Sequence, residues 1–383
     1  FVENNFPSED LIERENWALR WSTTYETGNL GIYTMVEYEE REQSGSVYRA
    51  VTEGDVWDTL EAALGPINVR GSDEEVDVDR SGGDNDDSDI LTLGLRVDYD
   101  FDFATLTSNT GYKDHDYYYN EDYDGTPLNL ETYRQDQEGD YFQQELRLTS
   151  NSEGPLSWYA GVSYYKEDLE TSYVFGGEED FFCQYSGYYY NYGMTFSGCE
   201  DLYSYYGSEF TPSANGLLEE TATIKGKYEG WGAYLNLAYF ITENVQIEGG
   251  LRWTDDEKEF TTSVPTPVSE LGPYWAFGYS TAEPLTAKES WDDVTPRFIV
   301  KWTPTETALL FASYTAGYKS GGFGTFSLAD NPDGDIAIGN VDIVRADGFL
   351  PDPVDPEEVD SYEIGYKDTF LDGTMNFDIV AFY

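Results

Sequence analysis

The chain has 383 residues, and its 75 Asp and Glu against 21 Lys and Arg give a formal net charge of −54. So acidic a surface repels phosphate and excludes a nucleic-acid-binding protein, whereas an aromatic content of 17% is too high for an intrinsically disordered chain. No run of about 18 apolar residues occurs, which excludes a transmembrane helix but leaves a membrane-spanning β-structure open.

Alternation of apolar and polar residues recurs along the chain and predicts strands with one apolar face and one polar face. Between Trp231 and Tyr239, Trp, Ala, Leu, Leu and Tyr occupy the odd-numbered positions, opposite Gly, Tyr, Asn and Ala. The same pattern covers 142–149, 245–256, 297–302 and 310–319. A soluble sandwich also shows this alternation, so the lengths of the connections must decide the class.

The expected connections alternate between short and long. Tight turns are expected near 27–29, 100–102, 151–155, 242–244, 303–306 and 371–373. Long polar loops are expected at about 42–88, 120–135, 176–219, 263–288 and 320–355. This arrangement predicts about twelve antiparallel strands in an all-β transmembrane barrel, with short periplasmic turns and long extracellular loops. Aromatic residues near the strand ends fit the girdles that flank the apolar band of such barrels.

Two features of the chain raise the question of a metal or an enzyme. The acidic runs 84–89 and 330–335 offer carboxylates to Ca²⁺, but neither has EF-hand spacing, and solvated outer loops are the simpler interpretation. The single histidine, His115, lies between Asp114 and Asp116, and no hydrolase or phosphate-binding motif accompanies it. We therefore expect no enzyme activity and no cofactor, with loop-bound calcium left open.

The loop 176–219 contains both cysteines, Cys183 and Cys199, without a zinc or redox spacing. A local disulfide is the simplest interpretation, and two free thiols are the alternative. The same loop is rich in tyrosine, whose rings either stack on a ligand or pack the loop over the barrel mouth. The candidate ligand-binding residues are Tyr185, Tyr188, Tyr189, Tyr190, Tyr192, Tyr205 and Tyr206.

Charged residues on the polar faces of the strands form a second group of interest. They either line a polar wall for a domain inside the barrel or satisfy one another across neighbouring strands. The set comprises Glu145, Arg147, Glu248, Arg252, Arg297, Lys301, Lys319, Glu363 and Lys367.

Several segments resemble the barrel of TonB-dependent outer-membrane receptors. The first is 295–304 (TPRFIVKWTP) followed by 310–323 (LFASYTAGYKSGGF), and the second is 355–373 (DPEEVDSYEIGYKDTFLDG), which resembles the family's late strand pair. The segments 142–148, 158–162 and 249–258 are similar to its mid-barrel strands. The resemblance covers roughly 90–383 and includes no plug domain, energy-coupling box or final strands. It implies that residues 1–383 are a barrel domain incomplete at both ends, in a family whose barrels have about 22 strands.

The resemblance also implies a function. Members of the family capture a scarce solute with the outer loops and the plug and import it with energy from TonB. The typical cargo is a ferric siderophore, and haem, cobalamin and saccharides are variants. The implied partners are the TonB complex, outer-membrane lipid, lipopolysaccharide and a small-molecule ligand in a Gram-negative bacterium. A passive porin or a structural outer-membrane barrel is the alternative.

Overall fold

The computed structural model describes residues 3–4, 12–46, 48–49, 54, 57, 61, 75–76, 78, 85–122, 124–126, 128–272, 276–277, 280–281, 283–324, 350 and 352–383. Twelve strands form one sheet in the order β14-β13-β12-β11-β10-β9-β8-β7-β6-β5-β3-β2. All neighbours in this sheet are antiparallel, and a separate parallel pair joins β1 (Glu3–Asn4) to β4 (Glu75–Val76). The predicted fold class is therefore confirmed.

The strands of the large sheet are up to 26 residues long, more than twice the roughly 9–11 residues that a transmembrane strand needs. They are β2 (Arg14–Thr27), β3 (Leu30–Gln43), β5 (Asn85–Asp100), β6 (Ala104–Asp122), β7 (Thr132–Ser150), β8 (Leu156–Glu178), β9 (Leu217–Thr242), β10 (Val245–Ser263), β11 (Leu285–Trp302), β12 (Leu309–Lys319), β13 (Glu357–Phe370) and β14 (Met375–Phe382).

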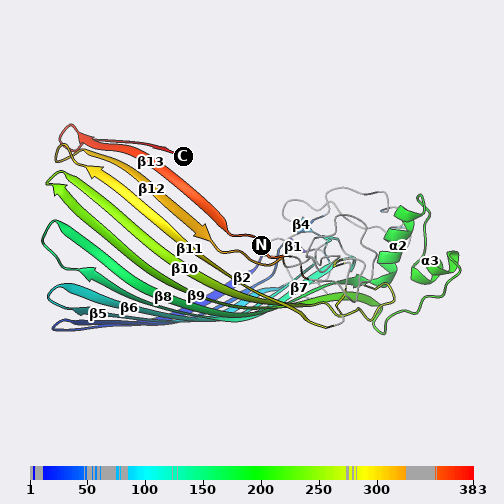
Figure 1. Ribbon diagram of the computed structural model, residues 1–383. Coiled ribbons are helices and arrows are strands. Elements are labelled where there is room, and N and C mark those ends of the chain that lie inside the picture. The colour runs from blue at the N-terminus through cyan, green and yellow to red at the C-terminus, as the bar shows by residue number, and fades with distance from the viewer. Residues whose placement is uncertain are drawn as a thin grey trace.

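Short turns gather at one end of the sheet, and the helices lie at the other (Figure 1). The turn between β2 and β3 has only Gly28 and Asn29, and the positive φ of Gly28, 54°, suits the tight hairpin turns that match strand twist. The predicted long loops begin or end a few residues away from the observed strand ends. Residues 325–349 of the last predicted loop lie outside the described residues.

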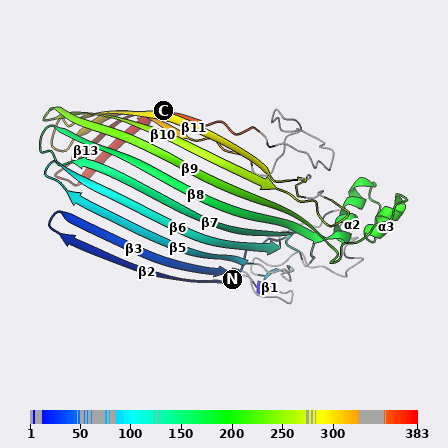
Figure 2. The same ribbon diagram turned by 60° about the horizontal axis from the view of Figure 1, so that its bottom comes forward.

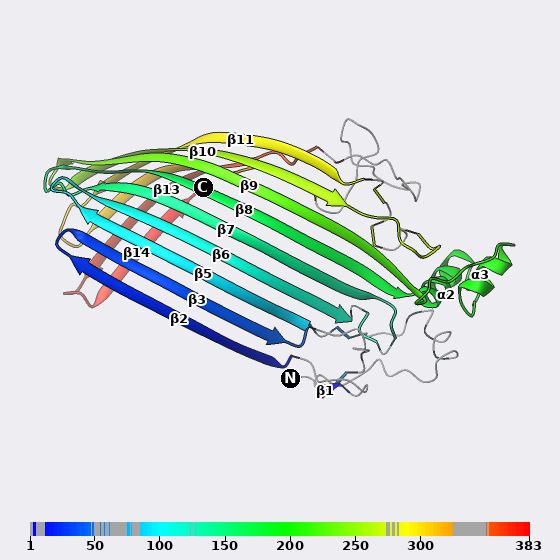
Figure 3. The ribbon, with the colours of Figure 1, turned by 90° about the horizontal axis from the view of Figure 1, so that it is seen from below.

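The sheet curves so that it has a convex and a concave side. Figure 2 shows the strands side by side in chain order, and Figure 3 shows β13 and β14 passing behind the strands of the opposite half. The edge strands are β2 and β14, which do not pair with each other among the described residues.

One face of the sheet carries exposed apolar side chains on ten of its twelve strands. Cross-strand register places these side chains on the same face, which we call the outer apolar belt. It comprises Leu19, Trp21, Val36, Leu93, Leu95, Leu146, Val162, Leu235, Leu237, Leu251, Val294, Phe298, Tyr362, Ile364 and Ile379. The opposite face contains the shielded residues Asn236, Glu248 and Ile299, and this shielding places it on the concave side. A polar concave side and an exposed apolar side are the arrangement that lipid requires of a barrel wall.

The helices are short and lie in a connection between strands. Among the described residues, no helix combines the length and the apolar character needed to cross a membrane.

Candidate ligand-binding site

The connection between β8 and β9 carries two helices, α2 (Glu179–Tyr190) and α3 (Cys199–Tyr205). Both lie at the end of the molecule opposite the short turns (Figure 1). All seven tyrosines predicted to bind ligand lie on these helices or next to them. The strand pattern did not predict the helices, because β8 extends directly into α2 without an intervening turn.

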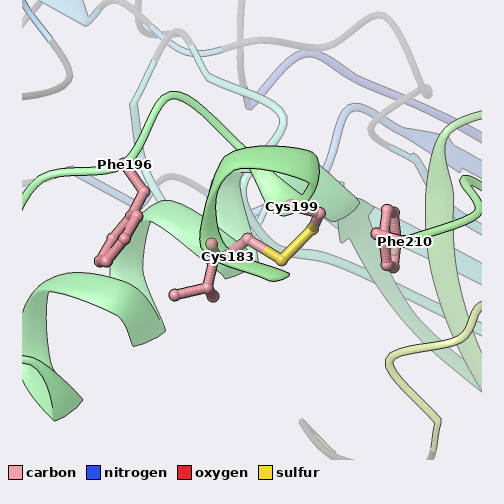
Figure 4. Close-up of a cluster of buried hydrophobic side chains, with 5 residues drawn as sticks. Cys183, Phe196, Cys199 and Phe210 are labelled. Atoms are coloured by element: carbon pink, nitrogen blue, oxygen red, sulfur yellow. A yellow bond between two sulfur atoms is a disulfide. The ribbon is translucent and has the colours of Figure 1, made fainter. Parts of the chain in front are cut away.

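A disulfide between Cys183 and Cys199 joins α2 to the start of α3. Its sulfurs lie in a small buried cluster with Phe196, Leu202 and Phe210 (Figure 4). Gly187 of α2 faces the Phe196 ring so closely that any added Cβ would collide with it. The two helices therefore form one packed unit, which we call the clasped cap (residues 179–210).

Hydrogen bonds from acidic side chains hold the clasped cap to itself and to the chain that follows it. The Asp180 carboxylate accepts the backbone N–H of Cys199 at 2.8 Å, and both oxygens of the buried Glu179 accept the N–H of Ser213 at 3.1 and 3.2 Å. Sequence reasoning missed both anchors, because an acidic pair at the start of a polar loop carries no signal of which amide it will bind. Such charge-assisted bonds are stronger than neutral ones.

Six of the seven predicted tyrosines are exposed, and we call them the tyrosine platform. They are Tyr185, Tyr189, Tyr190, Tyr192, Tyr205 and Tyr206. The seventh, Tyr188, is partly buried against Leu128 and Phe181, so its position suits a packing role. Rings within the platform contact each other, with centroids 4.7 Å apart for Tyr185 and Tyr189 and 5.2 Å apart for Tyr205 and Tyr206.

The end of α2 presents Tyr192 outward. The N–H of Asn191 donates to the Gly187 carbonyl at 3.1 Å, the N–H of Gly193 donates to the Tyr188 carbonyl at 2.9 Å, and Tyr192 adopts a left-handed φ of 57°. This conformation costs a residue with a Cβ about 1 kcal/mol. The side chain is fully exposed, at 103% of its reference area, so no contact within the described residues offsets that cost.

Two phenols of the clasped cap have raised pKa values. Burial raises the pKa of Tyr185, and burial together with the nearby Glu270 charge raises the pKa of Tyr203. A protonated phenol offers a hydrogen-bond donor beside an aromatic face, which suits ligands with oxygen acceptors and flat or ring surfaces.

The concave side of the sheet forms a second polar site, a cavity of 410 Å³ lined by Glu145, Arg147, Tyr234, Arg252, Arg297 and others. Glu145 accepts the Tyr234 hydroxyl at 2.6 Å. Among the described residues Arg147 makes no ion pair, and its Nε is buried without a hydrogen-bond partner.

Five of the other eight charges predicted for the polar wall form ion pairs. Glu248 lies 3.1 Å from Lys301 and 3.5 Å from Arg297. Lys319 pairs with Glu357 at 2.8 Å and Lys367 with Asp378 at 2.8 Å. Cross-strand pairing therefore accounts for these charges, whereas it does not account for Arg147.

Strand geometry separates His115 from the two acidic residues beside it in the sequence. His115 Nε2 lies 3.0 Å from Gln137 Nε2, and strand alternation turns Asp114 and Asp116 to the opposite face. In the described part of the chain, no three His, Cys, Asp or Glu are grouped so that they could hold a metal ion. Loop-bound calcium stays a prediction, since residues 330–335 lie outside the described residues.

A second acidic anchor lies in the loop between β6 and β7. Asp124 accepts the backbone N–H groups of Leu130 at 3.1 Å and Glu131 at 3.0 Å, and Asp122 accepts the N–H of Asp124 at 3.1 Å. Burial raises the pKa of both carboxyls, and for Asp122 the neighbouring Asp124 charge adds to the effect. Leu128 of the same loop packs on Phe181, so this turn supports the clasped cap.

Comparison with known protein families gives a match that covers almost the whole sheet. The family model described as "TonB dependent receptor-like, beta-barrel" matches residues 17–383. No curated protein sequence matches the chain. The ferric yersiniabactin uptake receptor FyuA of Yersinia pestis is a similar solved structure, with TM-score 0.65 and 11% identity over 100% of this chain and 47% of that one.

Two further solved structures share the fold. The siderophore receptor PiuA of Acinetobacter baumannii has TM-score 0.55 and 17% identity, covering 99% of this chain and 51% of that one. The ferric-catecholate import receptor Fiu of E. coli K12 has TM-score 0.54 and 16% identity, covering 100% and 52%. At these identities the likeness establishes the fold, and the chain spans about half the length of the receptors it matches.

Proposed function

The chain belongs to the TonB-dependent receptor β-barrel family, and from this membership we propose that it is the barrel part of a receptor that imports an iron complex across the outer membrane. The observation that carries the proposal is the family match over 17–383, which coincides with the twelve-stranded sheet. The family consists of outer-membrane transport receptors, so the porin and enzyme alternatives lose their support.

The proposed mechanism assigns separate tasks to the two ends of the sheet. The tyrosine platform on the clasped cap binds the complex from outside, with ring faces and phenol donors. The concave polar wall, with its 410 Å³ cavity, contacts a plug domain and the cargo inside the barrel. TonB supplies the energy through that plug.

The iron assignment draws on the solved receptors of the same fold, whose names specify ferric yersiniabactin, a siderophore and ferric catecholate. To test it, the complete gene is deleted and the strain is grown with one ferric chelate at a time as the iron source. Loss of growth on at least one chelate, with growth restored by the intact gene and not by a gene for a TonB-uncoupled receptor, supports iron import. Unchanged growth on every iron source, with slower growth on a vitamin or a saccharide, would overturn the iron assignment and keep the transport class.

A further inference from the structure

The tyrosine platform exposes more aromatic surface than packing of the cap requires. Tyr190 is 72% exposed, Tyr206 is 61% exposed, and Tyr192 is held fully outward at a conformational cost. Clustered aromatic rings left in water on a rigid support mark a binding surface. Because the disulfide and the buried Phe196 cluster fix the support, a ligand would lose little binding energy to ordering the loop.

The platform is also free of positive charge. Between Lys166 and Lys225 the sequence contains neither Lys nor Arg, whereas the first turn of α3 contains Glu200 and Asp201. Glu200 and Glu209 are exposed beside the platform. No cationic side chain of this loop can therefore bind an anion, and the nearest charges repel one.

The outward ends of the neighbouring strands add to this negative field. Asp89, Asp116, Glu138 and Glu170 stand directly opposite one another across β5, β6, β7 and β8. Strand alternation places them on the face that carries the outer apolar belt, where they line a cavity of 350 Å³ together with Asp87 and Asp136. Two of these carboxylates have cationic partners: Lys225 pairs with Glu170 at 2.7 Å, and Arg134 with Asp136 at 3.6 Å. Like charges facing each other across strands destabilise a sheet, so the rim keeps a strong negative potential at a cost in stability.

We propose that the receptor selects its cargo by charge: the tyrosine platform binds ferric chelates that carry no net negative charge, and the acidic cap and rim reject polyanionic ones. This inference rests on the proposed function and narrows its substrate class. Three hydroxamate monoanions neutralise Fe³⁺ and give a neutral complex whose iron-bound oxygens accept hydrogen bonds from phenol hydroxyl groups. Three catecholate dianions leave the complex triply anionic, and bringing it to this surface costs electrostatic energy that only salt can screen.

The test compares two chelates of similar size on the intact receptor in detergent. Binding of ferric tris-hydroxamate and of ferric tris-catecholate is followed by quenching of intrinsic fluorescence, at low and at high salt. We expect the neutral complex to bind at least about tenfold more tightly at low salt, and the difference to shrink at high salt, because the rejection is electrostatic.

Variants then separate stacking from charge. Tyr189→Leu and Tyr190→Leu should each weaken the neutral complex about tenfold, as the loss of an aromatic stacking contact does, whereas Val268→Ala, at an exposed position in the β10–β11 loop, should not. The double variant Glu200→Lys/Glu209→Lys should improve catecholate binding, and Glu200→Gln/Glu209→Gln should improve it less.

The outcomes distinguish failure of the charge-selection proposal from failure of the proposed function. Tighter binding of the triply anionic complex, or equal binding of both complexes that ignores salt and the lysine variants, would overturn charge selection and leave iron import standing. Failure of both complexes to bind, together with unchanged growth of the deletion strain on all iron sources, would overturn the proposed function itself.

Discussion

At the scale of single residues, Cys183 and Cys199 determine how firmly the clasped cap is held. They are separated by 16 positions, and closing a loop of that size stabilises a fold by about 3 kcal/mol. Replacing both by Ser should leave the sheet intact and expose the amides of α2. Hydrogen exchange measured by mass spectrometry checks this, with faster exchange expected in 179–205 and unchanged exchange in β9. Equal protection of the cap in the variant would show that packing alone holds it.

The Asp122–Asp124 pair makes the neighbouring turn sensitive to pH. Burial raises both pKa values above those of an unfolded carboxyl. The protonated form is therefore favoured in the folded turn. The stabilisation is complete below the ordinary carboxyl pKa, near 4, and is lost as the pH rises through the raised values.

We expect the amides of Leu130 and Glu131, which bind Asp124, to lose protection as the pH increases, after correction for intrinsic exchange. Asp122→Asn should flatten this dependence, since it removes one of the two charges. A protection that is constant with pH in the unmodified protein would contradict the assignment.

The residues of the candidate site could be identified from the sequence, but the contacts that they make could not. The seven tyrosines and two cysteines were identified because their clustering in one loop is visible in the sequence. The anchors Glu179, Asp180 and Asp124 were missed, because each binds amides whose position depends on the folded loop. Tyr188 was grouped with the exposed tyrosines because the sequence does not show that α2 turns this side chain toward Leu128 and Phe181.

At the scale of elements, alternation predicted the strands well. Alternation with a period of two is visible within each short segment of the sequence. The register of β9 with β8 and β10 then follows, because all three strands must place their apolar side chains on the same face. The helices were not predicted, because Tyr, Phe, Gly and Ser in α2 have modest helix propensity. Packing on the buried cluster, rather than propensity, stabilises such a short helix.

Adjacent residues of β12 test which face meets lipid. Ala312 lies in register with Val300 and Ile364, and Ser313 lies opposite Glu363. In the complete receptor, Ala312→Arg should destabilise the folded barrel by about 2–4 kcal/mol, because it turns a charge toward hydrocarbon. Ser313→Arg is the matched control and should be tolerated, since Glu363 can pair with it. Unfolding by denaturant in lipid vesicles measures both, and equal costs would argue against the assigned faces.

At the scale of the whole molecule, the sequence indicated a membrane barrel through the sorting of loop lengths rather than through hydropathy. The overall charge of −54 gave no hint of a membrane protein, and only the structure shows that the apolar side chains gather into one belt while charge lies on the concave side and at the outward ends. That β2 and β14 form the edges of the sheet could not be predicted, because the pattern of a strand does not specify its pairing partners.

The most direct test of the account follows single labels along β9 of the complete receptor in lipid vesicles. Positions 233–237 are replaced by Cys one at a time and labelled with a fluorophore, while Cys183 and Cys199 remain joined and unreactive. A quencher attached to lipid tails should quench the labels at 233, 235 and 237 strongly and those at 234 and 236 weakly, because alternate residues face opposite sides of the wall. Quenching without this two-residue alternation, or strongest at the even positions, would contradict the central claim that this face of the sheet lies against the membrane.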